Sequence, residues 1–299
     1  MKEGQKMTPQ QRRDGFADHW QAVYTFMPLF EEPVEMPSFE VFMDRMGQHF
    51  GHVEYMGENP ALPQKATDMA GFALMDHLVT DQEKKQEYPS QLLLFGMSEF
   101  DRELWDAHII SNFHACQEEE KEALLPRCRY ALLAANMMAA TLPMKEEYGI
   151  MASYADLLLE LFPDCLGIYW PHSQSFTSRS YYQQPHWYHA ENHFLDGGLN
   201  IRMFRIDGTD ELLFDTLGLT VIGLPDLQFH CKNLQPDEVV HFLRNLAAYL
   251  YESGDVIEDG NTVEGIHHEK WVCRREDALA GPMRVVLDVN PGIYAGGNR

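Results

Sequence analysis

Apolar residues recur at helical spacing in three long segments of the chain. The clearest segment covers residues 236–253, where proline occupies the first position and Gly254 follows the last, as is typical of helix boundaries. The same spacing predicts helices over about 119–140, with a kink or break at Pro126, and over about 151–162. The apolar face of the clearest helix consists of Val239, Phe242, Leu243, Leu246 and Leu250.

Short runs of β-branched and aromatic residues lie between these helices and predict strands. Asp207-Gly208 separates two of the runs and is typical of a hairpin turn. The run 92–97 fits a buried strand or part of a helix, because its periodicity does not separate the two. The other predicted strands cover residues 22–29, 53–56, 70–78, 108–113, 166–170, 199–206, 211–214, 221–222, 226–230, 271–273 and 284–289.

The order of these elements predicts an α+β fold. Strand–helix–strand arrangements recur over 22–56, 108–170 and 226–273, which favours a two-layer sheet-plus-helix architecture, with ferredoxin-like modules as one form of it. No proline- or serine-rich linker divides the chain. We therefore expect an N-terminal α+β module over residues 1–100, integrated with an α+β domain over residues 101–299.

The net charge of the chain indicates which macromolecules it could bind. The 299 residues include 46 Asp and Glu against 23 Lys and Arg, a formal net charge of −23. Such a field repels nucleic-acid phosphates and anionic membrane surfaces. A basic protein partner, or no macromolecular partner at all, fits this charge better than nucleic acid or a membrane. Solubility alone is the alternative explanation of the acidic composition.

Cysteine usage and the absence of apolar targeting segments indicate a cytoplasmic protein. The cysteines are odd in number, widely spaced and in no CxxC pair, which argues against a disulfide framework or a cysteine-rich zinc site. The N-terminus lacks the apolar core of a secretory signal. The longest apolar stretch, 130–144, is too short to cross a membrane and predicts a buried helix. The five cysteines are Cys116, Cys128, Cys165, Cys231 and Cys273.

One segment is similar to a known family. Residues 215–228 read Asp-Thr-Leu-Gly-Leu-Thr-Val-Ile-Gly-Leu-Pro-Asp-Leu-Gln, and with residues 159–170 upstream they resemble the bacterial domain-of-unknown-function family 4261. The resemblance extends over about 105–290. It implies an α+β protein with no assigned activity and no catalytic residues to transfer. The Gly-Leu-Pro-Asp turn also has a structural explanation, because Gly223 can adopt a positive φ, Pro225 has a fixed φ, and Asp226 can hydrogen-bond its own backbone. The alternative is a chemical role for Asp226 or Asp215.

Three histidines form the most specific candidate for a metal site. In the segment Pro-His-Trp-Tyr-His-Ala-Glu-Asn-His, His186, His189 and His193 would share one face of a helix. Three imidazoles on one face suit zinc or nickel, with His172 or a nearby carboxylate as a further ligand. The alternative is a polar, aromatic rim whose histidines only form hydrogen bonds. The segment lacks the HExxH spacing of metallopeptidases.

Aromatic side chains near the histidines suggest a second kind of site. Trp170, Trp187 and Tyr188 could line a groove for a peptide or small ligand, whereas the alternative is a loop packed on its own domain. The chain contains no GxSxG elbow, phosphate-binding loop or dinucleotide fingerprint.

Three functions follow from these patterns. The first is a non-enzymatic binding protein that engages a basic partner, as an immunity-type protein would. The second is a metal-binding protein or metal-dependent enzyme that uses the three histidines. The third is a small-ligand binder.

Overall fold

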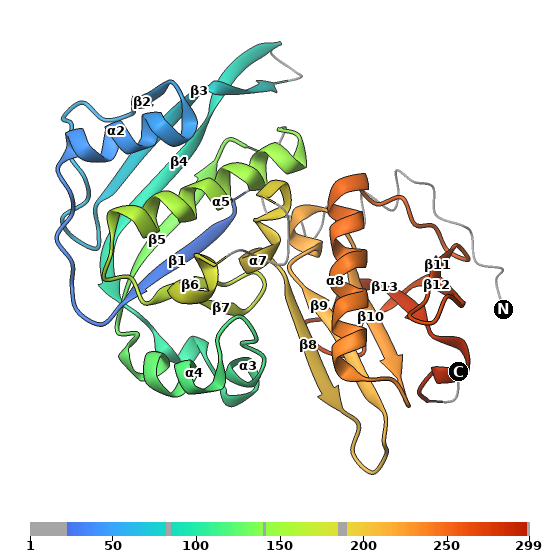
Figure 1. Cartoon of the computed structure of the whole chain (residues 1–299). Coiled ribbons are helices and arrows are strands. Elements are labelled where there is room, and N and C mark those ends of the chain that lie inside the picture. Colours follow the sequence, from blue (N-terminus) through green and yellow to red (C-terminus); the bar gives the residue numbers. More distant parts are fainter. Residues whose placement is uncertain (1–22, 82–84, 140–141, 185–189, 298–299) are drawn as a thin grey trace. The chain divides into compact units, whose positions relative to one another are not determined.

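The computed structural model describes residues 23–81, 85–139, 142–184 and 190–297. These residues form two compact units, an N-terminal unit up to Gly198 and a C-terminal unit from Leu199. Each unit contains a β-sheet packed with helices, so the α+β architecture is confirmed (Figure 1). None of the described helices has the length and apolar character needed to cross a membrane.

The N-terminal unit is built on a seven-stranded sheet with the order β2-β3-β4-β5-β1-β6-β7. All of its described strand pairings are antiparallel. Since β1 is first in sequence but lies between β5 and β6, the centre of the sheet joins distant parts of the chain. The strands are β1 Thr25–Phe30, β2 Val53–Tyr55, β3 Met69–Asp81, β4 Gln86–Glu99, β5 Tyr130–Met137, β6 Gly167–Trp170 and β7 Ser175–Ser178.

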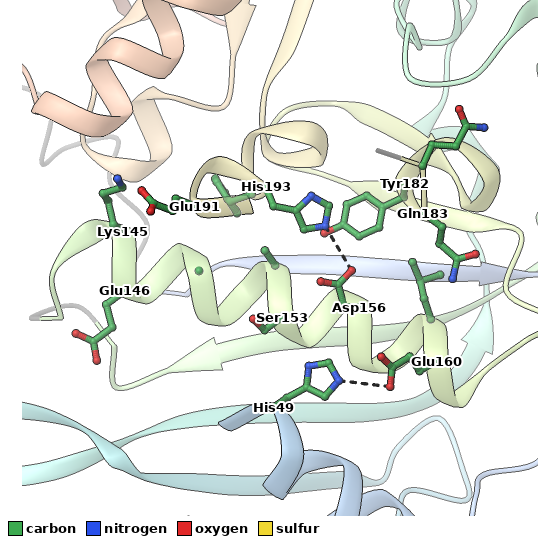
Figure 2. Close-up of a pocket in the computed structure, with 15 residues that line it drawn as sticks. His49, Lys145, Glu146, Ser153, Asp156, Glu160, Tyr182, Gln183, Glu191 and His193 are labelled. Atoms are coloured by element: carbon green, nitrogen blue, oxygen red, sulfur yellow. Dashed lines mark hydrogen bonds and ion pairs between the residues drawn. The ribbon is translucent and has the colours of Figure 1, made fainter. Parts of the chain in front are cut away.

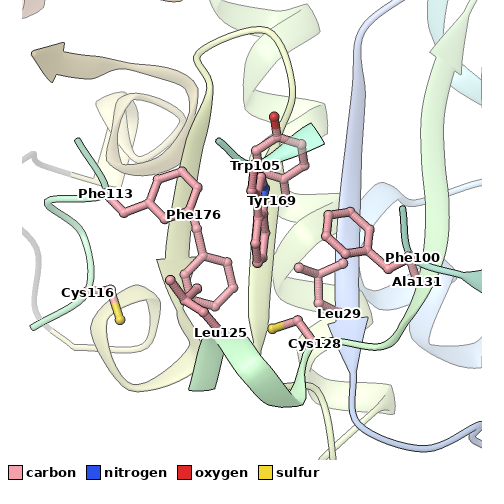
Figure 3. Close-up of a cluster of buried hydrophobic side chains, with 10 residues drawn as sticks. All are labelled: Leu29, Phe100, Trp105, Phe113, Cys116, Leu125, Cys128, Ala131, Tyr169 and Phe176. Atoms are coloured by element: carbon pink, nitrogen blue, oxygen red, sulfur yellow. The ribbon is translucent and has the colours of Figure 1, made fainter. Parts of the chain in front are cut away.

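Helices cover both faces of this sheet. Strand β1 directs successive apolar side chains to opposite faces and therefore contributes to the core on both sides. Phe26 packs against Tyr154 of α5, with ring centroids 5.7 Å apart. Leu29 belongs to a separate buried cluster near α3 and α4, which includes Trp105 and Tyr169 (Figure 3). The helices are α2 Phe39–Phe50, α3 Ala107–Ser111, α4 Glu118–Leu124, α5 Met144–Leu161, α6 Arg179–Tyr182 and α7 Leu195–Gly198, with 3-10 turns η1 Arg102–Leu104, η2 Leu125–Arg127 and η3 Ala190–Asn192.

The C-terminal unit has a six-stranded sheet with the order β11-β12-β13-β10-β9-β8. Only β10 and β13 pair in parallel among its described pairings, and the long helix α8 follows β10. Phe242 of α8 packs against Trp271 of β12 with ring centroids 5.1 Å apart. The elements are β8 Asn200–Arg205, β9 Leu212–Leu217, η4 Thr220–Ile222, β10 Asp226–Cys231, α8 Pro236–Ser253, β11 Thr262–Glu264, β12 Lys270–Asp277, β13 Val285–Asn290 and η5 Gly292–Tyr294.

Several predicted elements need correction. The helix expected over 119–140 is the short helix α4, a 3-10 turn at Pro126 and strand β5. Most of β5 is buried, and a strand with both faces covered has the same continuous apolar sequence as a buried helix. The strand expected at 108–113 lies mostly in helix α3, and the one at 221–222 in a 3-10 turn.

The domain boundary predicted at residue 100 differs from the division seen in the structure. Strands β4 and β5 lie on either side of it and pair in one sheet, for example Leu93 with Ala135. The two units instead divide between Gly198 and Leu199. The sheets also differ in topology, and the C-terminal unit runs β-β-β-α-β-β-β rather than the β-α-β-β-α-β order of a ferredoxin-like module.

Candidate functional site

A groove with a volume of about 1110 Å³ lies along the outer side of α5 in the N-terminal unit (Figure 2). Helix α5 places apolar residues such as Tyr154 and Leu158 in the core. Its opposite side presents a polar stripe at helical spacing. We call this feature the α5 groove. Its lining residues are His49, Lys145, Glu146, Gly149, Ala152, Ser153, Asp156, Leu159, Glu160, Tyr182, Gln183, Gln184, Glu191, His193 and Phe194.

His193 is held between two carboxylates in this groove. Its Nδ1 atom lies 3.0 Å from Oδ2 of Asp196. Its Nε2 atom lies 3.4 Å from Oδ1 of Asp156, a contact marked by a dashed line in Figure 2. The ring of Tyr182 packs beside the imidazole at a tilt of 41°, with centroids 4.6 Å apart. The Asp196 side chain is 1% exposed, whereas that of Asp156 is 41% exposed. The imidazole is therefore fixed from the interior and reaches the groove on its other side.

These contacts determine the charge of His193. Burial lowers the pKa of the imidazole, but the hydrogen bonds and charges of Asp156 and Asp196 outweigh burial and raise it to about 9. The ring is consequently an imidazolium at neutral pH. A protonated histidine cannot accept a proton as a general base, so this arrangement favours electrostatic or structural roles over base catalysis.

The groove carries an excess of negative charge. Its lining residues include four carboxylates, on Glu146, Asp156, Glu160 and Glu191, against two cations, the Lys145 ammonium and the His193 imidazolium. Besides Asp156, two of these carboxylates contact histidines. Glu160 lies 3.4 Å from Nε2 of His49, and Glu146 lies 2.8 Å from Nδ1 of His77. A cationic group entering the groove would meet carboxylates from both α5 and η3.

Only one of the three predicted metal-binding histidines can be placed. His193 lies in the α5 groove, whereas His186 and His189 lie outside the described residues, as do Trp187 and Tyr188 of the predicted aromatic groove. Within the described ranges, no group of three or more His, Cys, Asp or Glu residues is arranged to hold a metal ion. The proposed metal site therefore stays a prediction.

Two further predicted residues lie in the interior of the N-terminal unit. Trp170 is 0% exposed and packs against Phe26 and Tyr182. It is therefore a core residue and does not line the aromatic groove that the sequence suggested. Nε2 of His172 lies 3.2 Å from the Thr25 hydroxyl, and burial lowers the pKa of this imidazole to about 4. His172 is thus a neutral, internally bonded histidine.

The sequence analysis did not identify several polar residues that line the α5 groove beside His193. Asp156 and Glu160 lie one turn apart on α5, and His49 comes from α2. The polar stripe on the predicted 151–162 helix was the available signal for the two carboxylates. The contact between Asp156 and His193, which are 37 positions apart in the chain, left no local pattern to detect.

The C-terminal unit contains a buried network of charged residues. Asp215 accepts hydrogen bonds from Nε of Arg202 at 2.8 Å and from Nη2 of Arg284 at 2.8 Å. Asp226 accepts a hydrogen bond from Nε of Arg284 at 3.0 Å and another from the Thr220 hydroxyl at 2.7 Å. All four charged side chains are at most 4% exposed. Buried charges of this kind persist only when they are paired and hydrogen-bonded.

This network lies in the segment that resembled a known family. Gly223 adopts φ +81°, as the turn predicted, and it precedes the buried Asp226. Residues 215–290 match the family model for a domain of unknown function, DUF4261. No curated protein and no solved structure matches the chain.

The DUF4261 match covers part of the resemblance predicted over about 105–290. It includes Asp215, Asp226 and Arg284 of the buried network, and it extends from β9 to the end of β13. The α5 groove lies outside the matched residues. In the DUF4261 segment, Asp215 and Asp226 are thus fully engaged with arginine and threonine side chains, which gives them a structural explanation.

The cysteines offer no activated thiol. All five are buried and free. Burial raises the pKa of Cys116, Cys128, Cys165 and Cys231 to about 12, and that of Cys273 to about 11. Nucleophilic cysteines require a lowered pKa, so these residues are small apolar side chains of the interior.

Proposed function

We propose that the chain is a non-enzymatic binding protein whose α5 groove receives a basic segment of a partner protein. The observation that carries this proposal is the set of four carboxylates along one groove, which outnumber its two cations, Lys145 and the protonated His193. The formal net charge of −23 adds long-range attraction for a basic partner. An immunity-type role, in which the protein neutralises a basic partner, is one form of this function.

The state of the ionisable groups supports binding rather than catalysis. His193 has a raised pKa of about 9 and stays protonated at neutral pH, and the buried cysteine thiols stay protonated as well. Neither His193 nor the thiols are therefore available as a general base, and the His193 imidazolium acts as a fixed charge of the groove. The free cysteine thiols also favour a reducing compartment, so the proposal places the protein in the cytoplasm.

Binding of a labelled arginine-rich peptide tests the proposal directly. Glu160 and Glu191 are exposed groove residues, so the double variant Glu160→Gln, Glu191→Gln removes two charges with little risk to the fold. Two exposed ion pairs contribute about 1–2 kcal/mol in total, so the Kd measured by fluorescence anisotropy should rise roughly five- to thirtyfold. Raising the salt concentration should weaken binding to the wild type more than to the variant.

A matched pair of surface glutamates provides the control. Glu58 and Glu103 are exposed residues of the same unit outside the groove, so Glu58→Gln, Glu103→Gln makes the same change in net charge. This control should bind the peptide within twofold of the wild type. Equal weakening in both double variants would show that overall charge, and not the groove, attracts the peptide.

Metal binding through His193 is a second candidate function. Asp196 contacts Nδ1 of His193 from the interior, and a buried carboxylate on one ring nitrogen is the usual orientation of a metal-binding histidine. Elemental analysis of tag-free protein distinguishes the candidates. About one equivalent of zinc or nickel that disappears in His193→Ala and His189→Ala would favour metal binding, whereas less than about a tenth of an equivalent would exclude it.

A further inference from the structure

A second groove lies in the C-terminal unit between helix α8 and strand β11. Its volume is about 780 Å³. One wall is a stripe of α8 at helical spacing, which includes His241, Asn245 and Tyr249, and the other wall includes β11 and the preceding Val256. Tyr249 is 48% exposed and Val256 is 47% exposed. This α8–β11 groove therefore exposes apolar surface between a helix and a strand.

Strand β11 forms one edge of the sheet. It pairs only with β12 in the sheet order, with Val263 opposite Trp271. Asn261 accepts a hydrogen bond from Cys273 N–H, and Gly265 N–H donates to Glu269. Because antiparallel residues alternate between bonding toward and away from the partner strand, Thr262 and Glu264 direct their N–H and C=O groups away from β12. These outward groups can pair with another extended chain.

The faces of β11 determine which side chains such a chain would carry. Val263 is opposite Trp271, which packs on Phe242 of α8, so Val263 lies on the face toward α8. Glu264 lies on the other face. Glu238 of α8 belongs to the groove lining, which includes no lysine or arginine. Glu264 contributes its backbone to the lining, and its carboxylate on the other face contacts Nδ1 of His268, so an incoming basic side chain would share this carboxylate with His268. A strand added to β11 would therefore place apolar side chains toward α8 and basic side chains beside Glu264.

We infer that the α8–β11 groove binds an extended segment of a partner protein that alternates apolar and basic residues and adds to β11 as a further antiparallel or parallel strand. Main-chain hydrogen bonds from Thr262 and Glu264 supply affinity, and the apolar groove and Glu264 select the side chains. This inference concerns the C-terminal unit and is independent of the function proposed for the α5 groove.

Two peptide probes with the same side chains and different backbones can test whether a strand adds to β11. A fluorescein-labelled heptapeptide, Lys-Val-Lys-Leu-Lys-Val-Lys, carries the inferred pattern. A second probe has the same sequence with N-methyl groups at alternate positions, on the edge that would face β11. It can no longer donate N–H hydrogen bonds to β11, and its methyl groups obstruct close pairing, but it keeps every side chain. Anisotropy titrations of the full chain should give a Kd at least tenfold higher for the methylated probe. Equal affinity for the two probes would overturn the inference.

Protein variants locate the binding site. Thr262→Pro removes an outward N–H from an edge strand, where proline is tolerated, and should weaken binding of the unmethylated probe about tenfold. Tyr249→Ala removes an exposed ring from the opposite wall, so it tests the same groove without changing the strand. It should weaken binding severalfold. Leu279→Ala changes a residue that is 57% exposed and lies outside the groove, and it should leave the Kd within twofold.

The basic probe could also enter the α5 groove, and the Glu160→Gln, Glu191→Gln protein separates the two sites. Binding that persists in this protein but weakens in Thr262→Pro and Tyr249→Ala supports the α8–β11 groove, whatever the fate of the function proposed above. Binding that weakens only in the α5-groove variant would overturn the inference and would support the other proposal.

Discussion

The Oδ2 atom of Asp196 lies 3.0 Å from Nδ1 of His193, and the Asp196 side chain is almost completely buried. This contact joins a short helix at the end of the N-terminal unit to the wall of the α5 groove. It fixes the imidazole ring and leaves Nε2 beside Asp156 of α5. The charge of His193 therefore depends on two carboxylates from separate elements. Because these contacts exist only in the folded protein, the pKa shift of His193 can be measured through the pH dependence of stability.

The stability of the protein should fall as pH rises through the range in which His193 loses its proton. The pKa of His193 is raised from 6.5 to about 9, so its contribution is fully present below pH 6.5 and is lost as pH approaches and passes 9. The loss amounts to roughly 3 kcal/mol at most. Urea denaturation at a series of pH values measures it.

The variant His193→Gln provides the matched comparison. Gln keeps a polar side chain but does not titrate, so the part of the pH dependence between 6.5 and 9 that belongs to His193 should disappear. Asp196→Asn should lower the pKa of His193, because it removes the buried negative charge, and should move the transition to lower pH. If the wild type and His193→Gln gave parallel stability curves over this range, the proposed charge state of His193 would be wrong.

The buried carboxyl of Glu147 should make the protein less stable as pH rises from 4.5 to 7. Burial raises the pKa of this carboxyl from 4.5 to about 7, although a hydrogen bond from Asn136 opposes the shift. The unfolded chain therefore releases the proton first, and the free energy of unfolding falls between pH 4.5 and 7 by up to roughly 3 kcal/mol. Glu147→Gln avoids this loss and keeps an oxygen that can accept the Asn136 bond.

The measurement compares the free energy of unfolding of Glu147→Gln and the wild type at pH 4 and pH 8. The advantage of the variant should be larger at pH 8, by about 2 kcal/mol or more. Glu146→Gln, an adjacent glutamate that is 36% exposed, is the control and should show a much smaller change with pH. A constant difference between Glu147→Gln and wild type at both pH values would contradict the prediction.

Removing the charge of Asp215 should strongly destabilise the C-terminal unit. This carboxylate accepts hydrogen bonds from both Arg202 and Arg284, and all three side chains are buried. Asp215→Asn leaves buried positive charge without its partner, which costs about 3–5 kcal/mol. Chemical denaturation should show the loss, whereas Asp210→Asn, at an exposed position of the same unit, should change stability by less than about 0.5 kcal/mol. Similar stability of both variants would mean that the network is dispensable.

A single methyl group at Gly197 should test the packing around Trp170. A Cβ atom at Gly197 would lie 2.1 Å from the indole ring of Trp170, which is completely buried. Gly197→Ala should therefore destabilise the N-terminal unit by about 1–3 kcal/mol or more, because a packed ring has to move. Gly47→Ala in the exposed part of α2 meets no atom within 4 Å and should stabilise the helix by about 0.5–1 kcal/mol. A neutral Gly197→Ala would argue against a closely packed Trp170.

Helix α8 shows where local sequence is sufficient. The predicted range 236–253 agrees with the observed Pro236–Ser253, because proline, glycine and a regular apolar face all specify the same element. Strand β5 shows the opposite case. Its residues Tyr130–Met137 read equally well as a buried helix, and only hydrogen bonds with β4 and β1 at the centre of a sheet decide the strand.

The sequence by itself determined the α+β class, the acidic charge, the family-like segment and His193 as a residue to test. These properties depend on composition, on local periodicity or on short contiguous motifs, which the chain carries without folding. Only the tertiary structure decided that Trp170 is a core residue, that Asp156 and Asp196 hold His193 as a cation, and that carboxylates gather in one groove. Such contacts and burial arise between residues distant in the chain, and it is burial and proximity that determine charge and accessibility.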